Sequence, residues 1–372
     1  MSKVNHLLGI SGGKDSAALS IYMSQRHPEL DIEYYTCDTG KELQETYDLI
    51  NKLNSVLGKD IKLYKSMDEE NSPMKNPFDH FLEMYGGYLP SATARWCTAK
   101  MKLEPFEQHV GTAPTISYVG IRGDENRDGY ISTKENIQTI FPFRKNIWSE
   151  DVIRKFLNNA NIDFITQVYK DLNPDNLELI LEYVSQPISL RYTQKQKLNS
   201  LLDANTKVFN HVVFAWLKTT EYPVGQLDEF PLLDNDDNLD INDIFQILED
   251  SGVGIPAYYN PIQYQVEIDG EIHQGTYYRS RSGCFFCFYQ QNIEWVWLLE
   301  QHPELYEEAI KYEKEGYTWM EESLIELKKP ERVNAIKKEH YLRTNKQKAN
   351  QATSWKDQIL AAEAEGCASC FI

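Results

Sequence analysis

One stretch near the amino end decides the fold: the apolar run Val4–Ile10, followed at once by Ser11-Gly12-Gly13-Lys14-Asp15-Ser16. The run predicts a strand, and Ser16–Gln25 carries apolar residues at helical spacing. Glycines between a strand and a helix allow a tight turn, and the first N–H groups of a helix attract an anion. The stretch therefore predicts a phosphate-binding loop with Lys14 as an exposed charge. An ordinary strand-to-helix turn is the alternative reading, and the Walker pattern G-x-x-x-x-G-K-[ST] is absent.

Further strands and helices alternate beyond this loop. Apolar runs predict strands at Asp31–Cys37, Ile61–Tyr64 and Thr115–Ile121, and a regular apolar stripe predicts a helix over Lys41–Leu57. Strands separated by helices form parallel βαβ units with helices on both faces of the sheet. We therefore expect an α/β fold with an open, doubly wound parallel sheet.

The pattern of the sequence changes along the chain, and these changes predict four parts. Residues 1–147 form the nucleotide-binding α/β domain, 148–229 an all-helical insert, 230–315 a cysteine-containing completion of the catalytic domain, and 316–372 a charged helical tail. The third part contains an acidic loop, Phe230–Asp243, which lacks the Gly and Glu that a calcium-binding EF-hand requires. Asp240 is therefore expected to cap a helix over Ile241–Asp250. One amphipathic helix is expected over Ile293–Glu313.

Composition limits the class of protein. The chain has 372 residues, six cysteines and a net charge of −18, with no apolar run long enough for a membrane span or a signal peptide. We therefore expect a cytoplasmic protein with reduced thiols. A chain this acidic is a poor nucleic-acid binder over its whole surface. Nucleic acid would dock only at the basic stretch 328–348 or through a partner protein, and a solvated helix face is the simpler reading of that stretch.

Five ordered motifs resemble a known family. The Ser11–Ser16 stretch is similar to the signature of the PP-loop ATP pyrophosphatases, the adenine nucleotide alpha-hydrolases. Four further segments resemble the phosphoadenylylsulfate (PAPS) reductase family within that superfamily. They are Asp38-Thr39-Gly40-Lys41-Glu42 with Glu45-Thr46, Arg95-Trp96-Cys97-Thr98 with Lys102 and Pro105, Gly120-Ile121-Arg122 with Glu125 and Arg127, and Arg281-Ser282-Gly283-Cys284-Phe285-Phe286-Cys287.

The resemblance implies a fold of the HUP-like, PP-loop type and a nucleotide site. It assigns nucleotide binding to Ser11, Gly12, Gly13, Lys14, Asp15, Ser16, Asp38, Thr39, Gly40, Lys102, Gly120, Arg122 and Arg127. Lys14, Asp15 and Cys97 are the expected catalytic residues. The arginines are suited to fork-like recognition of phosphate or sulfate. An ordinary surface ion pair is the alternative for each arginine, as a solvent-facing lysine is for Lys102.

The cysteines suggest a metal site. Thiolates at Cys284-x-x-Cys287 spacing can share one metal, and the resemblance places Cys97 near them. Relatives hold a [4Fe–4S] cluster with a Cys-Cys pair plus Cys-x-x-Cys, but Thr98 replaces the second member of the Cys-Cys pair here. We therefore expect a three-cysteine cluster site, with zinc or plain buried thiols as alternatives. Cys367 and Cys370 form either a mobile redox pair or a terminus without a role.

Two enzyme functions follow from the resemblance. The first is sulfur transfer: ATP with Mg²⁺ is cleaved to AMP and pyrophosphate, and the activated acceptor receives sulfur through a cysteine or cluster, as in the sulfurtransferase component of DNA phosphorothioate modification. Its partner would be a sulfur donor such as a cysteine desulfurase. The second is reduction of phosphoadenylylsulfate or adenylylsulfate to sulfite, with a thioredoxin-like reductant. A catalytically silent regulatory subunit is a third reading, and a homodimer is left open.

Overall fold

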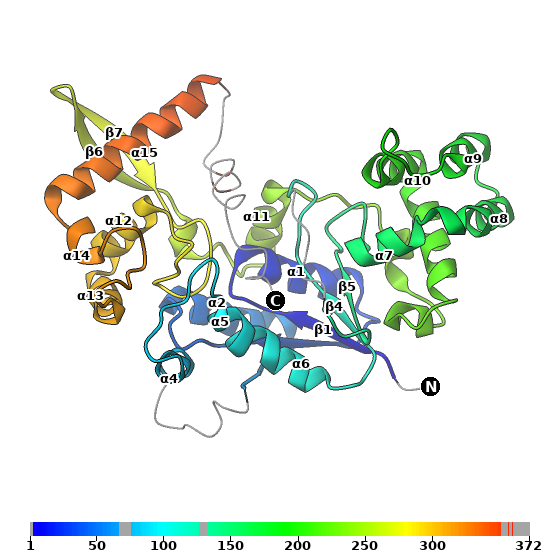
Figure 1. The fold of residues 1–372 in the computed structure, drawn as a ribbon, viewed down its shortest axis with the longest axis horizontal. Coiled ribbons are helices and arrows are strands. Elements are labelled where there is room, and N and C mark those ends of the chain that lie inside the picture. The colour runs from blue at the N-terminus through cyan, green and yellow to red at the C-terminus, as the bar shows by residue number, and fades with distance from the viewer. Residues whose placement is uncertain (1–2, 67–75, 126–131, 351–355, 357–358, 360–372) are drawn as a thin grey trace.

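A computed structural model describes residues 3–66, 76–125, 132–350, 356 and 359 (Figure 1). Its centre is a five-stranded parallel sheet with strand order β3-β2-β1-β4-β5. The strands are β1 (Asn5–Gly9), β2 (Ile32–Thr36), β3 (Lys62–Leu63), β4 (Thr115–Tyr118) and β5 (Ile137–Ile140). The predicted open α/β sheet is confirmed. β5 is an additional strand that the sequence analysis did not predict.

Both faces of the sheet are covered, as a doubly wound fold requires. On one face Leu8 and Ile32 belong to a core shared with α1 (Lys14–Arg26) and α2 (Gln44–Leu57). On the other face Leu7 of β1 and Tyr35 of β2 pack with Phe106 of α6 (Glu104–Val110). Successive strand residues point to opposite faces, so β1, β2 and β5 contribute to both cores.

The predicted helix Lys41–Leu57 begins three residues later, at Gln44. Residues 41–43 are extended instead: Glu42 forms an antiparallel bridge with Cys284, and the N–H of Phe285 donates to the carbonyl of Lys41 at 2.9 Å. Pairing with a distant segment replaces the first helical turn here. This pairing brings the Cys284 segment close to the end of β2.

Helices follow one another within the predicted insert, and they share their core with the sheet. It consists of α7 (Glu150–Phe156), α8 (Ile162–Leu172), α9 (Leu177–Ser185) and α10 (Gln194–Leu217). Buried residues of these helices, such as Phe156, Ile165 and Val213, belong to the same apolar cluster as Leu8 of β1. Figure 1 shows the insert on one side of the sheet, with the later hairpin and helices on the opposite side.

Residues after the insert return to the sheet and then form a second apolar core. Helix α11 (Ile241–Asp250) packs on α1, and the Asp240 side chain accepts hydrogen bonds from two N–H groups of its first turn, so the predicted cap is confirmed. The second core contains the antiparallel pair β6 (Ile262–Ile268) and β7 (Glu271–Tyr277), which the sequence analysis did not predict. The remaining helices are α4 (Pro77–Met84), α5 (Trp96–Thr98), α12 (Asn292–Gln301), α13 (Pro303–Tyr312), α14 (Leu324–Leu327) and α15 (Pro330–Asn350).

The single helix expected over Ile293–Glu313 is wrong. Helix α12 ends at Gln301, His302 is non-helical (φ −137°, ψ 63°), and Pro303 starts α13. Proline disfavours helical geometry in the residue before it and suits a first helical position, so the chain breaks between the two helices.

The basic stretch 328–348 falls mostly in α15, which packs against the hairpin and α12. Several of its cations are paired with carboxylates, including Lys328 with Glu307 (2.8 Å), Arg332 with Glu322 (2.6 Å) and Lys337 with Glu300 (2.6 Å). These pairs reduce the positive charge offered to a nucleic acid, and docking there stays a prediction. Within the described residues, every helix is too short or too polar to cross a lipid bilayer.

Candidate functional site

The predicted phosphate loop leads from β1 into α1 and is held by its own serines. The backbone N–H of Ser11 donates to the Ser16 hydroxyl at 3.1 Å, and that hydroxyl donates to the carbonyl of Gly13 at 3.2 Å. Gly12 has φ +77°, and a side chain there would lie 2.2 Å from Thr46 Cγ2. Only glycine suits both this backbone angle and this space. The loop backbone therefore packs closely against Thr46 of α2.

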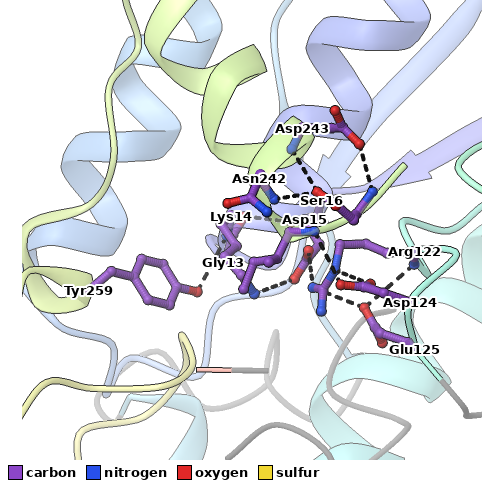
Figure 2. Close-up of polar contacts among 12 residues, drawn as sticks. Gly13, Lys14, Asp15, Ser16, Arg122, Asp124, Glu125, Asn242, Asp243 and Tyr259 are labelled. Carbon is purple, nitrogen blue, oxygen red and sulfur yellow. Dashed lines mark hydrogen bonds and ion pairs between the residues drawn. The ribbon is translucent and has the colours of Figure 1, made fainter. Parts of the chain in front are cut away.

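Two residues at the start of α1 are buried and charged (Figure 2). The Lys14 ammonium lies 2.8 Å from Asp15 Oδ2 and 5.4 Å from the centre of the Tyr259 ring. The side chain of Lys14 is 0% exposed, so the expectation of an exposed loop lysine is wrong. The reason is Tyr259, from a segment far along the chain, which covers the loop and also lies 3.4 Å from the backbone N–H of Lys14.

Asp15 links the loop to the end of β4 through Arg122. Arg122 Nη1 lies 2.6 Å from Asp15 Oδ1 and 3.0 Å from Glu125, while its Nε donates to Asp124 at 2.9 Å. Asp124 also accepts the N–H of Ile241 at 3.2 Å, so the network reaches the first turn of α11 (Figure 2). Burial alone raises the pKa of Asp15, but Arg122 and Lys14 outweigh it and hold that pKa well below its usual range.

Gly120 and Arg122 both contact the start of α1. A side chain at Gly120 would lie 2.8 Å from the backbone oxygen of Asp15, so a glycine permits the close approach of β4 to α1. The fork of Arg122 contacts carboxylates in this structure, and its role toward phosphate stays a prediction. Arg127 lies outside the described residues.

The second predicted segment, Asp38–Gly40, follows β2 at the same edge of the sheet. The Asp38 carboxylate accepts hydrogen bonds from Gly40 N–H (2.7 Å) and the Tyr47 hydroxyl (2.8 Å), which fixes a turn with Gly40 at φ +72°. The Thr39 hydroxyl donates to Glu42 at 2.9 Å and lies 3.1 Å from Cys284 Sγ. This turn therefore connects the end of β2 to the cysteine motif.

The structure brings the three predicted metal-ligand cysteines near one another, with Lys102 among them. Loss of water, with a smaller contribution from the neighbouring Cys287, raises the pKa of Cys97 to about 11, although Lys102 opposes both effects. Burial also raises the pKa values of Cys284 and Cys287, and Lys102 lowers both. Lys102 thus influences the pKa of all three thiols. The sequence analysis had assigned Lys102 only to nucleotide binding.

Three thiolates beside a cation have the chemistry of an iron–sulfur or zinc site. In the part of the chain that the structure describes, however, no group of three His, Cys, Asp or Glu side chains is arranged to hold a metal ion. The cysteines are close but not preformed as a ligand set. Cys367 and Cys370 lie outside the described residues.

Arg279 and Glu42 have buried polar atoms that lack hydrogen bonds, and the sequence analysis did not name Arg279. Arg279 is fully buried, and its Nη2 donates to the carbonyl of Cys284 at 2.6 Å. Nε and Nη1 of Arg279 and Oε2 of Glu42 have no hydrogen-bond partner within the described residues. Burial raises the pKa of Glu42, while Lys102 and Arg279 oppose that shift. Such groups cost free energy unless a ligand satisfies them.

Tyr258 and Ser282 complete the site and were also missed. The Tyr258 hydroxyl donates to the carbonyl of Gly12 at 2.8 Å, and Ser282 Oγ lies 2.7 Å from where a side chain on Gly13 would begin. The cysteine segment therefore packs directly on the phosphate loop. The double tyrosine Tyr258-Tyr259 was the available sequence signal, but nothing in it indicates contact with residues 12–14.

Comparisons with known proteins cover the amino-terminal part of the chain. Residues 5–170 match the phosphoadenosine phosphosulfate reductase domain. An uncharacterized protein of Methanocaldococcus jannaschii is 26% identical over 165 residues, which make up 41% of this chain and 37% of that protein. The matched part thus covers well under half of that relative. No solved structure matches the chain. By this match, residues 5–170 are similar to the phosphoadenosine phosphosulfate reductase domain.

Proposed function

We propose that this protein is an enzyme that cleaves ATP to AMP and pyrophosphate and uses the activated acceptor for sulfur transfer. One observation carries the proposal: Ser282 of the cysteine segment packs on Gly13 of the phosphate loop, with Cys284 two residues further along. Nucleotide phosphates held at the loop and sulfur carried on the cysteines would then meet at one edge of the sheet. Ligands of open α/β sheets bind at this edge, where the strand order reverses.

The loop residues would hold the phosphates. The N–H groups at the start of α1 and its helix dipole attract a pyrophosphate group, and negative charge develops on that group as it leaves. Lys14 and Arg122 add positive charge beneath the loop, where Asp15 fixes both of them in place. Mg²⁺ would arrive with ATP as part of the substrate.

In this reaction an oxygen of the acceptor attacks the α-phosphorus, the bond to the β-phosphate breaks, and pyrophosphate leaves. A sulfur nucleophile from a donor then replaces that oxygen, and AMP leaves with it. Cys97, Cys284 and Cys287 are the thiols that would carry the sulfur, as a persulfide whose outer sulfur attacks the activated acceptor. A second of these thiols would cleave the disulfide so formed, and an external thiol reductant would regenerate the pair. Burial raises the pKa of Cys287, and the cations Arg281, Arg279 and Lys102 offset part of that rise. A metal at these cysteines is not needed for any of these steps. A cysteine desulfurase as donor and a phosphorothioate-type acceptor remain predictions.

Reduction of phosphoadenylylsulfate to sulfite is the second candidate. The family match favours it, because the matched domain carries the name of that reaction. The same phosphate loop would hold the nucleotide, and a thiol would attack the sulfur instead of an acceptor attacking phosphorus. The buried, incompletely bonded Arg279 is compatible with an anionic group in either reaction.

A parallel assay separates the candidates. The protein, prepared without oxygen, receives ATP with Mg²⁺ and a sulfide donor in one arm, and phosphoadenylylsulfate with a dithiol reductant in the other. AMP and pyrophosphate from ATP support sulfur transfer, whereas sulfite with untouched ATP supports the reductase. Lys14→Met is the matched inactive control because it keeps the buried volume and removes the charge. If neither arm gives product when the acceptor and the donor are supplied, the result favours the third hypothesis, a regulatory subunit without catalytic activity.

A further inference from the structure

A tyrosine from a later segment of the chain covers the start of α1. Tyr259 ends the 3₁₀ turn Ala257–Tyr259, which lies between α11 and β6. Its hydroxyl lies 3.4 Å from the backbone nitrogen of Lys14 and points toward it (Figure 2). Lys14 is the first residue of α1, and the N–H groups of a first helical turn have no carbonyl partner within their own helix. The Tyr259 hydroxyl therefore accepts the hydrogen of an N–H group that the proposed function assigns to a phosphate oxygen.

The cover extends over the whole turn into α1. Residues 12–16 are all buried, and Tyr259 itself is only 1% exposed. The Tyr259 ring packs against the ring of Tyr258, with 4.6 Å between the centroids, and against Phe245 of α11, with 6.2 Å between the centroids. A phosphate oxygen opposite the Lys14 N–H would occupy the position of the Tyr259 hydroxyl. Tyr259 must therefore move away before a phosphate reaches this N–H group.

The hydrogen bond that holds Tyr259 over the loop is weak. Its length of 3.4 Å exceeds the usual N–H···O range of about 2.7–3.2 Å, and both groups are uncharged. A phosphate oxygen carries charge, and charge-assisted hydrogen bonds are about twice as strong as neutral ones. The Lys14 ammonium, 5.4 Å from the centre of the Tyr259 ring, adds positive charge on the same side. A phosphate can therefore replace the hydroxyl.

Tyr258, the preceding residue, is fastened more firmly. Its hydroxyl donates to the carbonyl of Gly12 at 2.8 Å, and its own carbonyl accepts the N–H of Arg279 at 2.9 Å. These two bonds tie the turn to the phosphate loop on one side and to the segment that precedes the cysteines on the other. The contact of Tyr259 with the loop is longer than either bond. The Tyr259 side chain can therefore swing away while Tyr258 keeps the turn in place.

We infer that Tyr259 is a gate of the phosphate loop, closed by its hydroxyl and opened by the phosphates of an incoming nucleotide. In the closed state the hydroxyl accepts the Lys14 N–H, and in the open state a phosphate oxygen takes its place. The closed state lowers the apparent affinity for the nucleotide, because only the open fraction of molecules is competent to bind. The inference rests on the proposed function for the position of the phosphates, and it requires no turnover.

Stopped-flow fluorescence tests the gate, with a fluorescent, non-hydrolysable ATP analogue and Mg²⁺ as the probe. Tyr259→Phe keeps the ring and removes the hydroxyl that closes the loop. This variant should bind the analogue about two- to fivefold more tightly, in the lower part of the range for one neutral hydrogen bond. The gain should come from faster association with unchanged dissociation, because the hydroxyl stabilises only the closed state.

Tyr306→Phe is the matched control. Tyr306 is also a buried tyrosine, and its hydroxyl donates to the carbonyl of Leu324 at 2.8 Å in the second apolar core. Its loss should leave both rate constants of analogue binding unchanged. Thermal unfolding of the two variants verifies that both are folded at the temperature of the measurement.

Three results would overturn the inference: equal rate constants in the wild type and Tyr259→Phe, weaker binding by Tyr259→Phe, or a gain that comes only from slower dissociation. The last two would mean that residue 259 contacts the bound nucleotide instead of excluding it. Binding by both proteins with equal rate constants rejects the gate and leaves the proposed function standing. Failure of both proteins to bind the analogue rejects the nucleotide site, and the proposed function and the gate with it.

Discussion

Asp15 and Arg122 lie 2.6 Å apart, from Oδ1 to Nη1, and both side chains are fully shielded from water. The pair joins the first turn of α1 to the end of β4 across the point where the strand order of the sheet reverses. Lys14 contacts the other oxygen of the same carboxylate at 2.8 Å. The geometry of the phosphate loop thus depends on one buried acid between two cations.

Replacing that acid should destabilise the protein. Asp15→Asn removes the carboxylate that lies between Lys14 and Arg122, while Asp124 and Glu125 still contact Arg122, so we expect a loss of about 3 kcal/mol in the free energy of unfolding, at the lower end of the range for a broken buried ion pair. Asp31→Asn is the matched control, because Asp31 also contacts two lysines but is exposed, and its loss should leave stability nearly unchanged. Urea denaturation of both variants measures the difference. Equal stability of the two variants would contradict the structural role of Asp15.

The same pair predicts a pH dependence. The pKa of folded Asp15 lies below the value of about 3.9 in an unfolded chain. A depressed pKa stabilises the folded state above the unfolded value, and this stability is lost as the pH falls toward the folded value. The stability difference between the wild type and Asp15→Asn should therefore be constant from pH 7 to 5 and shrink below about pH 4. A difference that stays constant down to pH 3 would show that the carboxyl pKa is not depressed.

Crowding at Gly12 is testable with a rescue variant. Gly12→Ala places an alanine at a positive φ and brings its Cβ against Thr46 Cγ2. The overpacking should lower the free energy of unfolding by about 1–3 kcal/mol beyond the effect of the backbone strain. Gly58→Ala is the control: Gly58 has φ +61° with open space around it, so this variant should lose stability only through backbone strain. Thr46→Ser removes the clashing methyl group, so combining it with Gly12→Ala should recover part of the stability. No recovery would show that Thr46 does not limit this loop.

The cysteines should behave as one site. If Cys97, Cys284 and Cys287 hold a metal or cluster, replacing any one by serine should remove most of the bound metal, because three-thiolate sites lose affinity when one ligand is lost. Cys367→Ser should retain it. Iron, zinc and sulfide contents with a visible spectrum, after purification without oxygen, give the readout. A wild type without metal would assign these residues to thiol chemistry alone.

Much of the fold follows from local patterns, and the exceptions have a common cause. The strands from β1 to β4 and the cap at Asp240 are visible in short windows of sequence, because pleat and capping chemistry are local. Residues 41–43 follow a helical pattern but pair with Cys284, more than 240 residues away. The burial of Lys14 under Tyr259 and the site position of Arg279 likewise depend on contacts between distant segments. Sequence motifs identify the parts of the site, and tertiary packing determines which of them meet.

The most direct test of the central claim is a co-crystal structure with a non-hydrolysable ATP analogue and Mg²⁺. Phosphate oxygens within about 3 Å of the backbone N–H groups of residues 11–16 are the expected result, which is the hydrogen-bond range for charged acceptors. The α-phosphorus should face the Arg279 and Cys284 side of the loop. An analogue bound elsewhere, or phosphates away from the start of α1, would contradict the account.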